Sequence, residues 1–324
     1  MKQTKGRITY YNTVKSKQID WLWYPYIPYG KITIIQGDPG EGKTTFILSL
    51  IAEMSNGGTL PFSNTPVEGV SIYQNTEDDI ADTIKPRLDI HKANCQRICF
   101  IDKAEGLTLD DDSIEEAIKA SGARLLVLDP IQSFVGENVD MNRANSIRPR
   151  MKKLKEMAER TGCAVVLIGH LNKNSGNKTN YRGLGSIDIP AAARSVLLVG
   201  KLDDQPHVRA VAQMKNNLAP IGKTLLFELK KGKVSWVCES NMTADDLATG
   251  INPYSNTKEE HAMNLIRELL SEGAMSAKEI YAIANEQDIG ERTLNIAKRN
   301  LHVQTYKEGT AWYWTLGIPE NVTE

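Results

Sequence analysis

Short apolar runs rich in β-branched residues recur along the first two thirds of the chain. They predict strands at residues 31–36, 70–74, 97–101, 125–128, 164–168 and 195–199. Several runs lack polar alternation, which is typical of strands buried on both faces of a parallel sheet. Helical spacing separates them, at residues 45–54, 80–92, 111–121 and 143–160. Because strands and helices alternate, we expect an α/β fold with a doubly wound sheet.

The pattern changes after residue 207, where apolar runs follow one another across short turns. These runs lie at residues 207–214, 224–229 and 233–237. Closely spaced strands joined by turns predict an antiparallel extension at the end of the sheet. We therefore expect a first domain over residues 1–240 and a polar linker over residues 241–257.

A second domain is expected over residues 258–324. Helical spacing begins at residue 258, a capping-box pattern at 276–279 opens a second helix, and a third runs from 290 to 301. Two strand-like runs follow, and three helices before a β-hairpin are typical of a winged helix-turn-helix. Residues 258–316 hold seven Lys and Arg against nine Asp and Glu. Because DNA-binding surfaces are usually basic, partner docking or ring packing fits this domain about as well as duplex binding.

Residues 37–44 read Gly-Asp-Pro-Gly-Glu-Gly-Lys-Thr, which fits the pattern Gly, four residues, Gly-Lys-Ser/Thr. Glycines let the backbone wrap around phosphates with its N–H groups facing the anion. Lys43 supplies a positive charge for the β- and γ-phosphates, and the Thr44 hydroxyl can ligate Mg²⁺. A strand before the loop and a helix after it place the phosphates at a helix N-terminus. The loop predicts that ATP and Mg²⁺ are bound by Gly37, Asp38, Pro39, Gly40, Glu41, Gly42, Lys43, Thr44 and Thr45.

Two later strands lead into carboxylates. Asp129 directly ends one of them, and a strand-end Asp beside a phosphate loop can hold Mg²⁺ through water. The alternative is an ordinary turn, because Pro130 follows. No Glu comes directly after Asp129, but Glu77 follows another strand and is placed to polarise the attacking water. Asp78 and Asp79 are rivals for that role, and all three acids are otherwise solvated groups at a helix start.

His170 ends a further strand, where a hydrogen bond to the γ-phosphate would let it sense ATP, although a lone His is more often structural or solvated. The order along the chain is the phosphate loop, then Glu77, Asp129 and His170. This order resembles that of the RecA-type ATPases. It resembles especially that of the hexameric replicative helicases of plasmids and phages that are similar to the RepA helicase. The resemblance covers about residues 20–237, with matching segments at 27–43, 181–186 and 213–220. It implies a RecA-like sheet and ATP hydrolysis in a ring.

The resemblance also implies roles for individual residues. It gives catalytic roles to Lys43, Glu77, Asp129 and His170. Members of this group complete the site from the neighbouring subunit, often with a Lys-X-Arg pair on a late strand. Here Lys215 keeps the Lys, whereas Asn217 stands where the Arg is expected. Arg209 is the best substitute and Arg194 a weaker one, and a surface charge is the alternative for each.

Basic residues gather in and beside the loops that follow two of the predicted strands. Residues 131–187 contain ten Lys and Arg against four Asp and Glu, in a chain whose net charge is −1. A ring would repeat this charge around a central pore and attract a phosphate backbone. The candidates for binding single-stranded DNA are Arg143, Arg148, Lys173, Lys178 and Arg182. A solvated helix face over residues 148–160 is the alternative for several of the charges.

Composition restricts the environment of the protein. The 324 residues are 41% hydrophobic and 24% charged, as in ordinary globular proteins. No apolar run approaches the roughly 18–20 residues of a membrane span, and no secretory signal is recognisable. Four scattered cysteines favour neither a disulfide framework nor a zinc site. These features predict a cytoplasmic protein with no membrane partner.

Two classes of function fit these observations. The first is a ring-shaped, hexameric DNA helicase of replication that moves along single-stranded DNA by hydrolysing ATP, with initiator or primase proteins as further partners. The alternative is a DNA-binding ATPase that is switched by its nucleotide and acts as a loader, recombination factor or regulator without unwinding. The helicase is the interpretation that we adopt, and the absent Arg of the Lys-X-Arg pair and the acidic second domain keep the alternative open. A small-molecule kinase shares the phosphate loop, but the late strands and polar loops fit ring assembly better.

Overall fold

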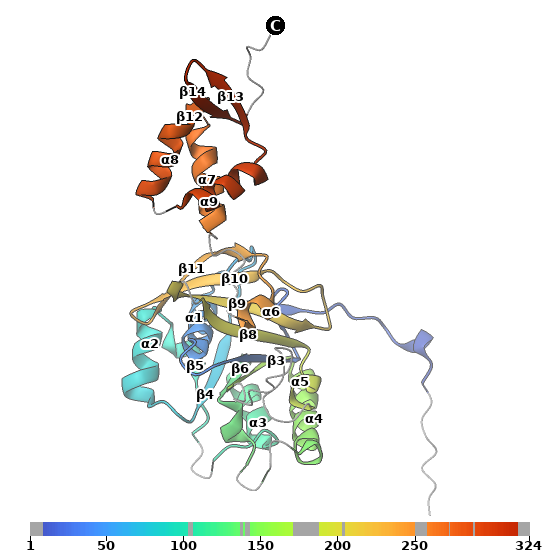
Figure 1. Ribbon diagram of the computed structural model, residues 1–324. Coiled ribbons are helices and arrows are strands. Elements are labelled where there is room, and N and C mark those ends of the chain that lie inside the picture. The colour runs from blue at the N-terminus through green and yellow to red at the C-terminus, as the bar shows by residue number, and fades with distance from the viewer. Residues whose placement is uncertain are drawn as a thin grey trace, which may run out of the picture. The chain divides into compact units, whose positions relative to one another are not determined.

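The computed structural model describes residues 9–102, 106–136, 139, 143–170, 188–202, 205–249, 258–271, 273–287 and 289–316. The chain divides into two compact units, Met1–Ile251 and Asn252–Glu324, and Figure 1 shows the elements of each. None of the helices in the described ranges is both long enough and apolar enough to cross a bilayer.

A large sheet forms the centre of the first unit. Within the described residues it has nine strands in the order β11-β10-β9-β8-β3-β7-β6-β4-β5. Their bounds are β3 (Ile32–Gly37), β4 (Val70–Asn75), β5 (Ile98–Cys99), β6 (Ala123–Asp129), β7 (Ala164–His170), β8 (Ser195–Leu202), β9 (Gln205–Asn216), β10 (Thr224–Lys230) and β11 (Lys233–Ser240). Pairing is parallel from β8 to β5 and antiparallel from β8 to β11. The sheet confirms the expected α/β fold. A separate antiparallel pair precedes it, β1 (Trp21–Trp23) and β2 (Ile27–Pro28).

Helices cover both faces of this sheet (Figure 1). The helical segments are η1 (Tyr11–Thr13), α1 (Lys43–Ser55), η2 (Ile80–Ile84), α2 (Lys85–Ile90), η3 (Cys95–Arg97), α3 (Asp112–Ser121), η4 (Ile131–Phe134), α4 (Ala144–Thr161), α5 (Asp188–Ala192) and α6 (Ala244–Ala248). Successive residues of a strand face opposite sides. In β3, Ile35 packs in one core with Phe46 of α1, whereas Ile34 packs in a second core with Met151 of α4. The central strands are therefore buried from both sides.

Two predicted elements differ in the structure. The strand expected at 97–101 is reduced to β5, because this segment lies at the edge of the sheet and, within the described ranges, pairs only with β4. The helix expected at 80–92 is divided into the π-helical turn η2 and the shorter α2. Pro86 stands in the first turn of α2, where the missing N–H of a proline does least harm.

The first unit also extends beyond the predicted boundary at residue 240. The segment interpreted as a linker contains α6, whose N-cap is Thr243 and whose capping box is completed by Asp246. Leu247 and Met242 are buried in a small core with Leu198 of β8. The linker prediction was therefore wrong over residues 241–248, because the apolar side chains among its polar residues are anchored on the antiparallel part of the sheet.

The second unit contains three helices and a small sheet. The elements are α7 (Lys258–Leu269), β12 (Met275–Ser276), α8 (Ala277–Glu286), α9 (Glu291–Asn300), β13 (Gln304–Glu308) and β14 (Ala311–Thr315). The strand order is β12-β14-β13. Trp314 is buried among Ile266, Ile280 and Leu294, so each helix contributes to one core. Assignment of this unit to the winged-helix class stays a prediction.

Candidate nucleotide site

The loop between β3 and α1 requires glycine for two physical reasons. Gly40 and Gly42 have φ angles of 80° and 91°, in the left-handed region that side chains disfavour. At Gly37 the obstacle is steric, because a Cβ there would lie 2.2 Å from the carbonyl oxygen of Val199 in β8. Gly42 is also the N-cap of α1, so no cap side chain competes for the helix N-terminus. The backbone is therefore shaped as phosphate binding requires.

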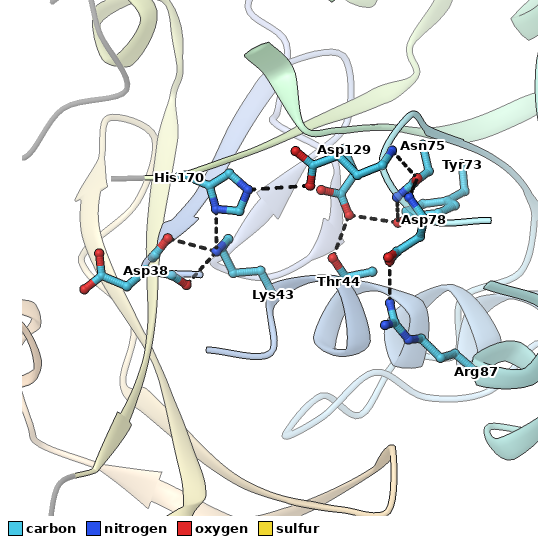
Figure 2. Close-up of polar contacts among 11 residues, drawn as sticks. Asp38, Lys43, Thr44, Tyr73, Asn75, Asp78, Arg87, Asp129 and His170 are labelled. Atoms are coloured by element: carbon cyan, nitrogen blue, oxygen red, sulfur yellow. Dashed lines mark hydrogen bonds and ion pairs between the residues drawn. The ribbon is translucent and has the colours of Figure 1, made fainter. Parts of the chain in front are cut away.

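Lys43 points back into this loop (Figure 2). Its ammonium Nζ donates hydrogen bonds to the carbonyl oxygens of Gly37 and Asp38, each at 2.8 Å. The side chain is buried, and burial lowers its pKa, although nearby carboxylates oppose the shift. The positive charge is thus held at the point where the sequence places the β- and γ-phosphates.

Asp129 meets the loop from the end of β6. Its Oδ2 accepts hydrogen bonds from the Thr44 hydroxyl and from the Tyr73 hydroxyl, each at 2.8 Å (Figure 2). Asp129 is only 4% exposed. Burial raises the pKa of this carboxyl, whereas the hydrogen bonds from Tyr73 and Thr44 lower it. A hydroxyl that donates to the carboxylate keeps its lone pairs for a cation, so Thr44 and Asp129 form an oxygen donor set that fits Mg²⁺.

His170 lies between the phosphate loop and the carboxylate of Glu77. Its position at the end of β7 follows from the strand register, which pairs it with Gly37. The imidazole Nδ1 lies 3.3 Å from Nζ of Lys43, and Nε2 lies 3.8 Å from a carboxylate oxygen of Glu77. The Glu77 side chain is 58% exposed, so its carboxylate is accessible to water. The structure therefore brings together Lys43, Thr44, Glu77, Asp129 and His170, whose roles in catalysis and in binding nucleotide or metal stay predictions.

The rivals of Glu77 have other partners. Asp78 forms an ion pair with Arg87 of α2, with 2.7 Å between oxygen and nitrogen (Figure 2). Asp79 caps η2 by accepting hydrogen bonds from the backbone N–H groups of Ala81 and Asp82. These contacts leave Glu77 as the best placed of the three acids for activating water.

Asn75 and Tyr73 belong to the site although the sequence did not single them out. Oδ1 of Asn75 accepts hydrogen bonds from the backbone N–H groups of Glu77 (2.9 Å) and Asp78 (2.7 Å). Its Nδ2 donates to the Tyr73 hydroxyl at 3.2 Å. An Asn at a strand end, two residues before an acid, is the signal for such an Asx turn, and it offered a way to find Asn75.

The phosphate loop is also fastened to β8. The carboxylate of Glu41, at the fifth position of the loop, accepts a hydrogen bond from the backbone N–H of Lys201 and lies 3.7 Å from the Lys201 ammonium. Glu41 is largely buried. The loop is therefore supported on the side that faces the antiparallel half of the sheet.

Arg209 and Lys215 lie on β9, and both are engaged within their own chain. The Arg209 guanidinium donates to the carbonyl oxygens of Pro206 and Val208. The Lys215 ammonium donates to the carbonyl oxygens of Pro190 (2.8 Å) and Ala193 (2.9 Å), and burial lowers its pKa. In this arrangement Lys215 anchors α5 and the turn after it. Roles for Lys215 and Arg209 at the ATP of a neighbouring subunit stay predictions.

The structure describes only part of the predicted DNA-binding set. Lys173, Lys178 and Arg182 lie outside the described residues. Arg143 is the exposed N-cap of α4, and Arg148 forms an ion pair with Asp188 at 3.0 Å. Other basic side chains of α4 pair with acids on or just before α3: Arg150 with Asp110, Lys153 with Asp112 and Arg160 with Glu115. These acids lie outside residues 131–187. They therefore neutralise part of the positive charge that was counted in that range.

A family match decides the classification. Residues 11–176, slightly more than half of the chain, match the family described as the AAA domain. The chain belongs to this family. The matched range contains β3, the phosphate loop, α1, Lys43 and the four residues gathered around it.

Individual relatives point to the same class of ATPase. The chain is 31% identical to DNA repair protein RAD51 homolog 2 of Mus musculus over 40% of its own length and 39% of the relative. It is 24% identical to DNA repair protein RadA of Brucella abortus, over 63% of this chain and 40% of the relative. It is 23% identical to Protein RecA of Rickettsia canadensis, over 85% of this chain and 82% of the relative. It thus spans about two fifths of the first two relatives. Together with the family match, these similarities support the expected RecA-type P-loop ATPase.

A solved structure is also similar in part. The KaiC-like protein of Pyrococcus horikoshii OT3 aligns with 65% of this chain and 91% of its own, at 18% identity and a TM-score of 0.47.

Proposed function

We propose that the protein is a Mg²⁺-dependent ATPase that acts on single-stranded DNA as an assembly of several subunits. The observation that carries the proposal is the convergence of Lys43, Thr44, Glu77, Asp129 and His170 at one end of the parallel strands. The relatives named as DNA repair proteins and RecA support DNA as the partner. Self-association is proposed from the resemblance to ring-forming ATPases.

Each residue of the site has a task in this proposal. Lys43 and the loop N–H groups bind the phosphates, and Thr44 and Asp129 would hold Mg²⁺, which neutralises charge on the β- and γ-phosphate oxygens. Glu77 orients the attacking water and accepts its proton, because its carboxylate is accessible beside the loop. His170, which contacts the lysine, hydrogen-bonds the γ-phosphate and so distinguishes ATP from ADP.

The first form of the proposal is the replicative helicase expected from the sequence, a hexameric ring that hydrolyses ATP at its subunit interfaces. A second form is a DNA-binding switch without unwinding activity. The contacts of Lys215 favour this second form, because the lysine expected to reach a neighbouring site is bound to carbonyls of its own chain.

Three measurements on the full chain test the proposal. ATP hydrolysis should rise when single-stranded DNA is added, and native mass spectrometry should show an assembly of several copies. A forked duplex separates the two forms, because only the helicase unwinds it. ATP hydrolysis that is indifferent to DNA would contradict both forms and leave a P-loop ATPase with another partner.

A further inference from the structure

Two side chains of β4 lie beside the proposed Mg²⁺ carboxylate because of strand register. Tyr73 and Asn75 are two residues apart, so they share one face of the sheet. β4 runs parallel to β6, and their register pairs Asn75 with Asp129. The two positions therefore place a phenol and an amide next to the carboxylate at the end of β6 (Figure 2).

Hydrogen bonds connect Asp129, Tyr73, Asn75 and the backbone of residues 77–78 in a series, which we call the relay. The single proton of the Tyr73 hydroxyl is donated to Oδ2 of Asp129, so the hydroxyl accepts the proton of the Asn75 amide. This fixes the orientation of Asn75, whose Oδ1 then faces the N–H groups of Glu77 and Asp78. These hydrogen bonds run without interruption from the carboxylate of Asp129 to the backbone N–H groups of Glu77 and Asp78.

The surroundings hold the relay at both ends. Tyr73 is buried, and burial raises the pKa of its hydroxyl, so that it stays a donor at neutral pH. At the other end, Asp78 is anchored to Arg87 of α2. The backbone around Glu77 is thus fixed, whereas its carboxylate is exposed to solvent.

We propose that Tyr73 and Asn75 are positioning residues that couple the Mg²⁺ carboxylate Asp129 to the segment that carries Glu77. The inference rests on the proposed ATPase function. It adds that the relay keeps the Mg²⁺ ligand Asp129 and the water-activating Glu77 in fixed relative positions. Neighbours that orient a metal ligand typically change metal affinity or activity by about 10–100-fold when they are removed.

The first test uses Tyr73→Phe, which removes the hydroxyl and keeps the ring. A fluorescent ATP analogue is bound to the full-length protein while Mg²⁺ is titrated. We expect the Mg²⁺ concentration at half-saturation to rise by roughly 10-fold or more, with unchanged binding of the analogue in a metal chelator. Tyr26→Phe is the matched control, because Tyr26 is also buried and its hydroxyl donates to the carbonyl oxygen of Lys223, at 2.7 Å. That control should behave as the wild type.

The second test asks whether Asn75 acts through Tyr73. Asn75→Ala should also raise the Mg²⁺ requirement, although Asn75 reaches Asp129 only through the tyrosine. The double variant should then require no more Mg²⁺ than Tyr73→Phe alone, because both changes break one relay. Effects that multiply, or an Asn75→Ala protein with the wild-type Mg²⁺ requirement, would overturn the coupling.

The outcomes also separate this inference from the proposed function. A wild-type protein that binds no ATP analogue contradicts the ATPase proposal itself. A wild-type protein that binds the analogue with Mg²⁺, together with a Tyr73→Phe variant of equal Mg²⁺ requirement, contradicts only the relay. Thermal melting of each variant without nucleotide identifies any loss of fold, which would lower binding in the chelator as well.

Discussion

Lys43 is the residue on which ATP binding depends most directly. Its ammonium is enclosed by two carbonyl oxygens of the loop, which are neutral acceptors that phosphate oxygens would replace. We predict that Lys43→Ala abolishes hydrolysis, measured as phosphate release, because the β- and γ-phosphates lose their cation. Lys85→Ala is the control, since Lys85 is exposed and pairs with Asp89. Retained hydrolysis in Lys43→Ala would refute the assignment of the site.

Asp129 combines a functional role with a cost in stability. Burial raises its pKa, so the folded protein binds this proton more tightly than the unfolded chain, and stability decreases as pH rises through the folded pKa. The ionised form of this buried carboxylate therefore lowers the stability of the nucleotide-free protein. Asn at this position removes the charge and keeps an acceptor for Thr44 and Tyr73.

We predict that Asp129→Asn abolishes Mg²⁺-dependent hydrolysis and raises the melting temperature of the nucleotide-free protein at pH 7. The gain should shrink toward about pH 4, where an ordinary Asp carboxyl begins to be protonated. Differential scanning calorimetry at several pH values measures both effects. Asp89→Asn is the control, because Asp89 is exposed and its substitution should leave hydrolysis intact. A lower melting temperature for Asp129→Asn at pH 7 would contradict the argument.

The sequence identified five side chains that the structure brings together, but it missed Tyr73 and Asn75. Tyr73 lies in an apolar strand, where a Tyr is an ordinary β-forming residue. Its hydrogen bond to Asp129 joins residues 56 positions apart and depends on the register of β4 against β6. Register between strands that are not neighbours in sequence is not encoded in a local pattern, so this part of the site required the structure.

At the scale of elements, α6 shows how a short helix becomes part of a domain. Leu247 is buried against β8, and the capping box of Thr243 and Asp246 satisfies the first turn. We predict that Leu247→Ala lowers the free energy of unfolding by about 2–5 kcal/mol, as is typical for truncating a buried leucine. Urea denaturation measures this change. Asp245→Ala, at an exposed position of the same helix, should have a much smaller effect.

The strands with continuous apolar runs were predicted most completely. The strands that became β3, β6, β7 and β8 are uniformly apolar over most of their length, and such runs are recognisable without any knowledge of their neighbours. The helix α6 was missed because it is short and its sequence is mostly polar. The pairing of α3 acids with α4 cations was missed for a different reason, since it depends on which helices lie side by side.

At the scale of the whole molecule, the two units have separate cores. The core around Trp314 is built from residues of the second unit, and the two cores of the large sheet from residues of the first. We predict that residues 1–251 expressed alone bind an ATP analogue and melt cooperatively. A chain ending at residue 240 should melt at a lower temperature, because it lacks α6. Equal melting temperatures would show that α6 contributes little.

The contact between Gly37 and β8 limits which segments of this protein can be transplanted or permuted. A Cβ added at Gly37 would lie 2.2 Å from the carbonyl oxygen of Val199, and two residues farther along β8 the backbone N–H of Lys201 donates to the Glu41 carboxylate. The phosphate loop therefore packs on β8, where the parallel and antiparallel parts of the sheet meet, and its shape depends on that strand. A grafting or circular-permutation experiment that separates β3 from β8 removes one wall of the loop. Residues 195–202 must accompany the loop into any chimaera that is meant to keep its shape.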